Sequence, residues 1–565
     1  MRPPATFIWK HLRHPYRRIT LVGLVALTIV VLSACDNGDG DQSNSGGAST
    51  GQGVEPQIGG SIIRHLESDC KTLNWVLYTT VYEEYVIRYL FDNLLDYNEN
   101  LEIVPVLAKE FEISKDHLEI TVRLKEDMVW HDGEPITADD IKFTVEAILD
   151  PAIPAVNKEG WFSRLDKVEV VDPHTVIFRW KEAYAPALHA LTQFAPIPRH
   201  VYDVPDFLTN PANRAPVGSG AFKFKEWRTN QTITIVRNEN YHGENAYLDR
   251  ITFRIIPDRA VALNALKAGE LDEMRVRQIQ WEKQTSDAEF ERRFNKTYYD
   301  VPQYNYMSWN CRSVWFSDKR VRIAISMLFD RELVNDKVYS GYAKLVSGPF
   351  YINSWAYDRT IAPRKFDPTE AARLLDEAGW VDSDGDGVRD KDGVKFEFEF
   401  FITAGSRISS DMVLVLQEQC SKAGIDLKIR QIEGATFFDT VFKGEYDAAL
   451  LAWRLDIDPD LYDTFHSSQV PPIGLNHAFY SNSRVDSLLV LGRSEFDKEK
   501  RAHIYRQVHQ LIHDDPPYTF INSVPEKRPI HKRIRNVTIS PDGPFRFYPG
   551  GIYWYVHNDS KDAVP

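Results

Sequence analysis

Apolar residues in this sequence follow two different periods in different stretches, and this mixture limits its fold more than any other feature. They alternate with mostly charged residues over 118–124 and 394–400, which predicts strands with one solvated face. They recur at helical spacing over 141–149 and 371–378. The two patterns alternate irregularly along 565 residues, and no unit of about 20–50 residues repeats. We therefore expect a mixed α/β or α+β fold with more than one lobe.

Local signals mark where helices begin and end. Thr137, with Asp140 three residues later, has the pattern of a capping box. Asp367 precedes a proline that suits a first helical turn, and Gly379 follows the last apolar residue of that helix. The same signals predict two further helices, at 317–328 and from about 411 to 424.

The first 34 residues have the pattern of a targeting segment. Basic side chains precede residues 19–34, an apolar stretch shorter than the roughly 20 residues that span a bilayer. The stretch ends in LSAC, residues 32–35, which resembles the lipobox of bacterial lipoproteins. We therefore predict a signal peptide at 1–34 and a lipid anchor on Cys35, with an uncleaved membrane anchor as the alternative.

Residues 35–60 are rich in Gly, Ser, Asp and Asn, which predicts a flexible tether with a reach of roughly 25–30 Å. Asp36 directly after the cysteine resembles the signal for staying on the inner membrane. We expect the protein on the periplasmic side of that membrane, or on the cell surface of a single-membraned bacterium. No later stretch approaches 18 uninterrupted apolar residues, so we expect a soluble body that contacts the membrane through its anchor only.

Charge and cysteine usage argue against several classes of function. The net charge of −14 disfavours nucleic acid or an anionic membrane as the main partner. Besides Cys35 the chain has three cysteines, which are Cys70, Cys311 and Cys420, so at most one disulfide forms within the chain. None of them has CxxC spacing, which argues against a zinc or redox site. GxSxG, Walker A and GxGxxG patterns are also absent, so acyl transfer, nucleotide hydrolysis and dinucleotide chemistry lack a motif.

Seven stretches, in order, carry a resemblance to a known family. The first half contains VPVLAKEFEISKDHLEITVRLKEDMVWHDGEPITADDIKFT (104–144), PVGSGAFKFKEW (216–227), RNENYHGENAYLD (237–249) and ALKAGELD (265–272). The second half contains WNCRSVWFSDKRVRIAISMLFDRE (309–332), FDPTEAARLLDEAGW (366–380) and AGIDLKI (423–429). Together they resemble the extracellular solute-binding proteins of the dipeptide/oligopeptide/nickel family, which are receptors of ABC importers.

The resemblance implies a fold of two lobes and three subdomains that encloses its ligand by hinge closure. On this chain it implies a lobe I core formed by 61–90, 216–305 and 525–558. The extra subdomain of lobe I would span 91–215, and lobe II would span 306–524. The chain is expected to cross between lobes near 300–312 and 520–528. Gly133, Gly218 and Gly220 suit turns with positive φ, and Gly269 suits a helix C-cap.

The resemblance also suggests ligand contacts in LLAWRLDIDPD, residues 450–460. In peptide-binding members a Trp lies here with an Asp three residues later that pairs with the peptide's α-ammonium, and Trp453 and Asp456 occupy those positions. A closed cleft desolvates that ammonium, and a carboxylate offsets the cost. The alternatives are a solvated Asp456 in an acidic loop and a Trp453 that belongs to the core.

Two further positions are candidate ligand contacts. DCKTLNW, residues 69–75, matches a segment near the family's cleft entrance, but Trp75 stands where proline is usual. An exposed Trp75 would stack on ligand, whereas a buried one would belong to the core. Asn476 lies in a loop that approaches ligand in relatives.

Two clusters raise the question of a metal. Asp382, Asp384, Asp386 and Asp390 stand at positions 1, 3, 5 and 9 of an EF-hand-like loop, but position 12 is a glycine. Structural calcium and an acidic surface turn both remain open, and no cofactor is required. His509 and His513 are four apart on a predicted helix without the Glu of HExxH, which favours a solvated helix face.

The function that these observations favour is a monomeric, membrane-tethered receptor without covalent chemistry. It would capture a solute, with a peptide as the favoured ligand, close around it and deliver it to an ABC permease. Alternatives are the same fold binding an oligosaccharide, opine or metal chelate, a secreted hydrolase, and a sensory partner of a membrane receptor.

Overall fold

The computed structural model describes residues 56–155 and 158–556. The predicted signal peptide, Cys35 and nearly all of the predicted tether lie outside these residues. Within the described part, no helix has the length and apolar character needed to cross a membrane.

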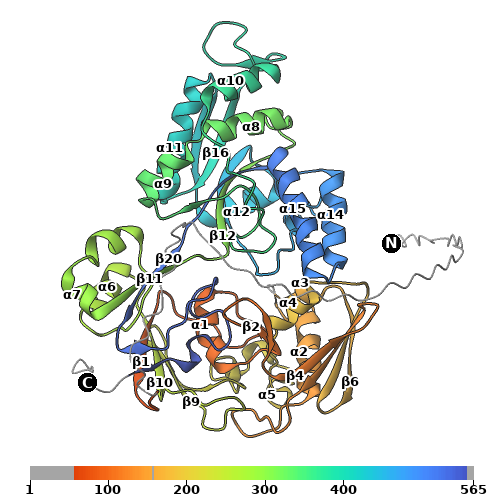
Figure 1. Cartoon of the computed structure of the whole chain (residues 1–565), viewed down its shortest axis with the longest axis vertical. Helices are drawn as coiled ribbons and strands as arrows, with labels where there is room; N and C mark the ends of the chain where they lie inside the picture. Colours follow the sequence, from red (N-terminus) through yellow and green to blue (C-terminus); the bar gives the residue numbers. More distant parts are fainter. Residues whose placement is uncertain (1–55, 156–157, 557–565) are drawn as a thin grey trace, which may run out of the picture. The chain divides into compact units, whose positions relative to one another are not determined.

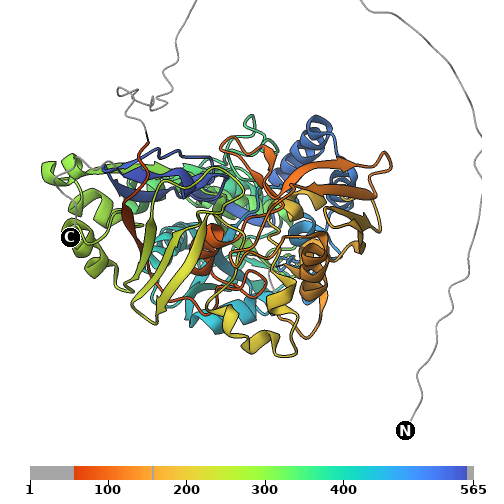
Figure 2. The same cartoon turned by 90° about the horizontal axis from the view of Figure 1, so that it is seen from below.

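The first sheet has four strands in the order β1-β10-β9-β8, which lie side by side in Figure 2. Its strands are β1 (Ser61–Leu66), β10 (Arg250–Ile255), β9 (Thr232–Arg237) and β8 (Phe222–Arg228). β1 pairs in parallel with β10, and the other pairs are antiparallel. The sheet therefore joins two segments that lie far apart in the sequence.

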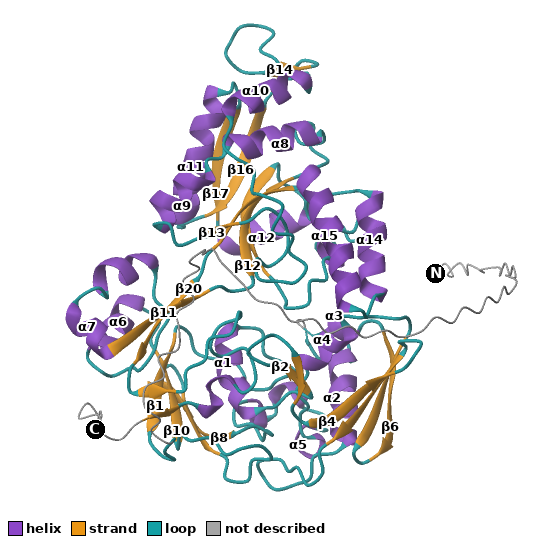
Figure 3. Cartoon of the chain, in the orientation of Figure 1, coloured by secondary structure: helices purple, strands orange, loops and turns teal. Residues whose placement is uncertain are grey.

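The second sheet is antiparallel and has the order β4-β5-β7-β6. Its strands are β4 (Ala108–Ile113), β5 (Glu119–Leu124), β7 (Thr175–Trp180) and β6 (Leu165–Asp172). β5 buries every second residue, which confirms the strand predicted at 118–124. Helix α2 (Ala138–Leu149) packs against this sheet (Figure 3) and begins with the predicted capping box of Thr137 and Asp140.

A six-stranded sheet with the order β13-β19-β12-β18-β16-β17 organises the second half of the chain. Its strands are β13 (Lys344–Leu345), β19 (Tyr518–Ser523), β12 (Gln303–Trp309), β18 (Ala448–Arg454), β16 (Glu397–Thr403) and β17 (Asp426–Ile432). The alternation predicted at 394–400 is confirmed within β16, where Phe398 and Phe400 are buried, Glu397 is exposed and Glu399 is half-buried. The pattern changes just beyond the predicted stretch. Phe401 belongs to one hydrophobic core and Ile402 to another, because the sheet is covered on both faces there.

Helices α8, α9, α10 and α11 lie around β16 and β17 (Figure 1), and span Lys319–Leu328, Arg331–Tyr339, Pro368–Glu377 and Arg407–Lys422. α10 has Asp367 as its N-cap, as predicted. α8 begins two residues later than predicted, because Asp318 caps it by accepting the N–H of Arg320. α11 begins earlier, with Ser406 as its cap.

The chain passes twice between these halves through neighbouring connections. β11 (Phe294–Tyr299) pairs antiparallel with β20 (Glu526–His531). β12, which follows β11 in the chain, pairs with β19, which precedes β20, within the six-stranded sheet. The crossings are therefore at 300–302 and 524–525. We refer to 61–299 plus 526–556 as lobe I and to 303–523 as lobe II.

The remaining elements are short strand pairs and helices. The strands are β2 (Leu95–Tyr97) with β3 (Ile103–Pro105), β14 (Asp390–Lys391) with β15 (Val394–Lys395), and β21 (Ile534–Arg535) with β22 (Tyr555–Val556). The helices of lobe I are α1 (Val81–Leu90), α3 (Glu159–Phe162), α4 (Ala187–Thr192), α5 (Arg199–Tyr202), α6 (Arg259–Lys267) and α7 (Ala288–Arg293). Those of lobe II are α12 (Gly434–Lys443), α13 (Tyr462–Phe465), α14 (Ser483–Ser494) and α15 (Lys498–Asp514).

Two of the predicted glycine turns have a different physical cause. Gly133 and Gly269 have φ of 98° and 82°, as predicted, but Gly218 and Gly220 are not in the left-handed region. A Cβ on Gly218 would lie 1.9 Å from the carbonyl oxygen of Leu90. Glycine is required there because the end of α1 approaches the backbone closely.

Candidate ligand-binding site

The loop that follows β18 carries three carboxylates, and lobe II itself neutralises two of them. Asp458 accepts two hydrogen bonds from Arg501, at 2.5 and 2.8 Å. Asp460 accepts one from Nε of Arg493, at 2.7 Å, and one from the N–H of Tyr462, at 3.1 Å. These two aspartates therefore serve the internal structure of lobe II.

Asp456 differs from both of its neighbours. Its side chain is 67% exposed, and among the described residues no donor lies within hydrogen-bond distance of its carboxylate. The basic nitrogen within 4 Å of it is Nε2 of His189, which belongs to α4 of lobe I and lies 3.9 Å from Oδ1. Asp456 therefore presents a free carboxylate toward the opposite lobe, where a ligand cation can bind.

Charge around Asp456 keeps it ionised. Desolvation acts to raise its pKa, but the contact with His189 and the positive charges of Arg546 and Arg454 outweigh it and hold the pKa below its ordinary value. A carboxylate in this state is the form that pairs with an ammonium group.

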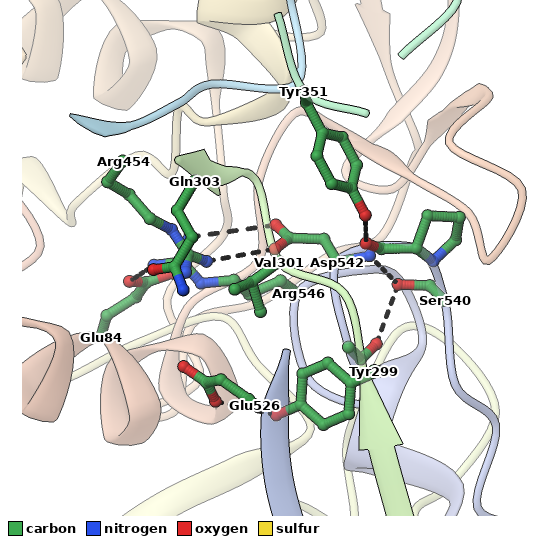
Figure 4. A network of polar contacts seen from close by, with 12 residues as sticks. Glu84, Tyr299, Val301, Gln303, Tyr351, Arg454, Glu526, Ser540, Asp542 and Arg546 are labelled. Carbon is green, nitrogen blue, oxygen red and sulfur yellow. Dashed lines mark hydrogen bonds and ion pairs between the residues drawn. The ribbon is translucent and has the colours of Figure 1, made fainter. Parts of the chain in front are cut away.

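Two arginines near Asp456 are already paired, as Figure 4 shows. Nη2 of Arg454 lies 3.1 Å from Oδ1 of Asp542, a contact that joins lobe II to lobe I. Arg546 forms an ion pair with Glu84 of α1. Burial raises the pKa of Asp542 to about 6, although both arginines oppose this rise. The arginines are thus committed to other carboxylates, which leaves Asp456 available.

Cavities lie beside these residues. One of about 250 Å³ is lined by residues of both lobes and of the crossing at 300–302, including Val301, Arg454 and Asp542. Another, of about 990 Å³, has Tyr97 and His189 of lobe I and Trp355 and Asp458 of lobe II in its lining. The candidate site therefore lies between the lobes, where ligand pockets commonly form.

The chain also matches a known family. The family model for "Bacterial extracellular solute-binding proteins, family 5 Middle" matches residues 102–470. The chain belongs to this family. It is therefore an extracellular solute-binding protein.

Alignments with related proteins cover most of the length of this chain. The oligopeptide-binding protein AppA of Bacillus subtilis is 32% identical over 515 residues, which cover 89% of this chain and 92% of AppA. The structure of AppA in complex with a nonapeptide matches with a TM-score of 0.73 and 30% identity, over 89% of this chain and 100% of AppA.

Two other solved structures match both lobes of this family member. The ABC transporter substrate-binding protein CtaP of Listeria monocytogenes has a TM-score of 0.77 and 26% identity, over 88% of this chain and 100% of CtaP. NikZ of Campylobacter jejuni, in complex with Ni(L-His), has a TM-score of 0.73 and 25% identity, over 88% and 99% of the two chains. The predicted two-lobed binding-protein fold is confirmed.

The other predicted ligand contacts of this family member are buried or half-buried. Trp453 is half-buried and stacks parallel to Tyr306, with ring centroids 6.1 Å apart. Trp75 is 4% exposed and meets Phe194 edge to face, so it is part of the lobe I core. The ligand roles of both tryptophans stay predictions.

Asn476 is fully buried and ties its own loop together. Its Oδ1 accepts the N–H of Tyr480 at 3.0 Å, and its Nδ2 donates to the carbonyls of Tyr480 and His466 at 2.9 and 3.1 Å. Its amide is therefore engaged in the loop, and its predicted contact with ligand stays a prediction.

The acidic loop brings together three of its four predicted ligands. Carboxylate oxygens of Asp382, Asp384 and Asp390 lie within 4.8 Å of one another. Asp386 lies outside this group and forms an ion pair with Lys395, whose Nζ is also 3.5 Å from Oδ2 of Asp384. Calcium binding at this loop stays a prediction, and Asp386 would have to leave Lys395 to take part.

The structure also bears on the predictions for the histidine pair and for the cysteines. The prediction of a solvated helix face is wrong for His509, which is fully buried in α15, where Nδ1 accepts the N–H of Asp358 at 3.1 Å. The three described cysteines are free thiols, so Cys70, Cys311 and Cys420 form no bridge with one another.

Sequence reasoning missed His189, Arg454 and Asp542. They lie on segments far apart in the chain, and none of them carries a motif. Arg454 lies within the segment 450–460 that the family resemblance singled out, but no role was predicted for it.

Proposed function

We propose that this protein captures peptides outside the cytoplasmic membrane and delivers them to an ABC permease. The observation that carries this proposal is the free carboxylate of Asp456, which faces lobe I while Asp458 and Asp460 are neutralised within lobe II. The α-ammonium of a peptide is a cation that such a carboxylate binds. The oligopeptide-binding relative AppA and the transporter protein CtaP support the choice of ligand and of partner.

Closure follows from where the contacts lie. A ligand whose amino terminus binds Asp456 on lobe II and whose body contacts lobe I binds the closed state better than the open one. Only such a differential contact shifts the equilibrium between the two states. The crossings at 300–302 and 524–525 are the segments about which the lobes would rotate.

The proposal includes a location and a state. The protein is a monomer held to the membrane by lipid on Cys35, and it releases its ligand unchanged because it binds without covalent chemistry. Globomycin treatment and mass spectrometry of the purified protein would test the anchor. Retention of the first 34 residues without lipid would contradict it.

Native mass spectrometry of the purified protein tests the ligand. We expect a series of bound masses that correspond to short peptides, and we expect the Asp456→Asn variant to lose them. Asp166→Asn, at an exposed position of β6, is the matched control and retains them. A protein that carries no peptide and that no peptide pool stabilises would contradict the proposal.

A second candidate ligand class is a metal chelate, because NikZ, the relative in complex with Ni(L-His), matches with the same TM-score as AppA. The same experiment separates the two. A single bound mass that contains a metal would favour the chelate.

A further inference from the structure

His189 has a buried ring nitrogen without a hydrogen-bond partner. The side chain is 6% exposed, and Nε2 is among the buried polar atoms that lack a partner in the described structure. This atom faces Asp456 at 3.9 Å, which is too long for a hydrogen bond. A buried polar atom without a partner is rare, and here it is aimed at the carboxylate of the candidate site.

The other ring nitrogen determines which proton His189 carries. Nδ1 lies 3.1 Å from the hydroxyl of Tyr97, and burial holds the pKa of Tyr97 well above its ordinary value, so the phenol keeps its proton. When the imidazole is neutral, the facing carboxylate favours the tautomer with the ring proton on Nε2, and in that tautomer Nδ1 accepts the hydrogen bond of this hydroxyl. When the imidazole is protonated, both nitrogens carry a proton. In either state an N–H of His189 points at Asp456.

A small set of groups acts on the charge of His189. Asp456, Asp458 and Arg501 act on His189 from lobe II, and Tyr97 from β2. Burial acts to lower the pKa of His189, but Asp456 outweighs it, and the pKa lies above its ordinary value. Asp456 therefore favours the imidazolium over the neutral ring in the ligand-free protein.

A ligand ammonium at Asp456 would be a second positive charge beside this imidazolium. Asp456 is a single carboxylate, and Arg454 and Arg546 already contribute positive potential there. The like charges repel, and the lowest-energy response is for His189 to lose its proton to solvent.

We propose that His189 is an internal competitor for Asp456: its imidazolium faces the carboxylate at 3.9 Å in the ligand-free protein, and capture of an amine displaces its proton. The proposal rests on amine recognition by Asp456 and adds a specificity residue to it. His189 selects against ligands that bring a further cation close to Asp456, and it makes capture depend on pH. Affinity falls as the pH drops below the pKa of His189 in the ligand-free protein, and it is level above that pKa.

The test uses a pool of random nonapeptides with free amino termini and compares the apparent affinity at pH 5.5 and pH 7.0 by native mass spectrometry. For the unmodified protein we expect about a fourfold weaker affinity at pH 5.5. His189→Gln keeps an N–H donor that does not titrate, and it should show less than half of that change. His200→Gln is the control, because His200 also contacts an aspartate, Asp132, but on the surface of lobe I. An equal pH ratio in the unmodified protein and in His189→Gln would overturn the proposal.

A ligand-free measurement separates this proposal from the assignment of peptides as ligands. The ring signals of His189 are followed by NMR through a pH titration, with the His189→Gln spectrum for their assignment. We expect the titration midpoint to move to lower pH in Asp456→Asn. An unchanged midpoint overturns the proposal even if peptides bind, whereas a shifted midpoint in a protein that binds no peptide supports the pair and contradicts only the peptide assignment.

Discussion

Arg501 donates hydrogen bonds to both carboxylate oxygens of Asp458, at 2.5 and 2.8 Å, and so fixes the loop that carries Asp456. The two side chains are 7% and 11% exposed. Burial acts to lower the pKa of Arg501, but Asp458 outweighs it and raises that pKa, so the guanidinium stays charged.

Breaking this pair from one side should destabilise the protein. Arg501→Met leaves a buried carboxylate without its partner, and we expect the free energy of unfolding to fall by about 3–5 kcal/mol. The double variant Arg501→Met with Asp458→Leu should recover part of the loss, since neither charge then remains buried. Urea denaturation measures both. Losses that simply add would show that the two side chains act independently.

N-acetylation of peptides should reveal the role of Asp456. Acetylation removes the charge of the amino terminus, so it should weaken binding to the unmodified protein by about 2–5 kcal/mol. In Asp456→Asn, free and acetylated peptides should bind with similar affinity. Calorimetry with both peptide forms checks this, and an equal acetylation penalty in the two proteins would exclude Asp456 as the partner of the amine.

The stability of the protein should fall in mild acid, in part because of His131. Nδ1 of His131 accepts the N–H of Gly218 and Nε2 lies 3.0 Å from the carbonyl of Gly220, which suits the neutral ring. Burial lowers its pKa to about 4, from an ordinary value near 6.5. Between these values the unfolded chain binds a proton that the folded protein does not, so stability decreases as the pH falls from about 6.5 to 4.

His131→Gln removes this coupling. The variant should be less stable at pH 7, but its stability should depend less on pH, by up to about 3 kcal/mol between pH 6.5 and pH 4. Thermal and urea unfolding across this range provide the measurement. A pH slope identical to that of the unmodified protein would mean that His131 titrates normally in the fold.

The pair of Arg454 and Asp542 should favour the closed state of the ligand-free protein. Asp542→Asn removes the charge that faces Arg454 across the lobes, and we expect a larger radius of gyration at pH 7.5 in small-angle X-ray scattering. The unmodified protein should lose the same contact below about pH 6, where Asp542 becomes protonated. Glu110→Gln, which breaks an exposed pair with Arg123 within lobe I, is the control and should leave the radius unchanged.

Local sequence patterns predicted the local structure well. The capping box at Thr137, the N-cap at Asp367 and the alternation in β5 all depend on residues within one turn or one strand, and the structure has them in place. The alternation predicted at 394–400 also holds within β16, but the burial of Phe401, just beyond it, depends on elements that cover the sheet from the other side. Sequence reasoning failed in its explanation of Gly218, which is required by the distant carbonyl of Leu90.

The sequence by itself determined the family, the order of the elements and the acidic loop in which the candidate site lies, because each of these depends on residues that are neighbours along the chain. Only the tertiary structure distinguished Asp456 from Asp458 and Asp460. The three are chemically identical in the sequence, and their difference comes from Arg501 and Arg493, which reach two of them from neighbouring helices, and from His189, which the other lobe brings close to the third. Burial and partnership of a charge depend on what the fold places around it, and that arrangement cannot be derived from spacing along the chain.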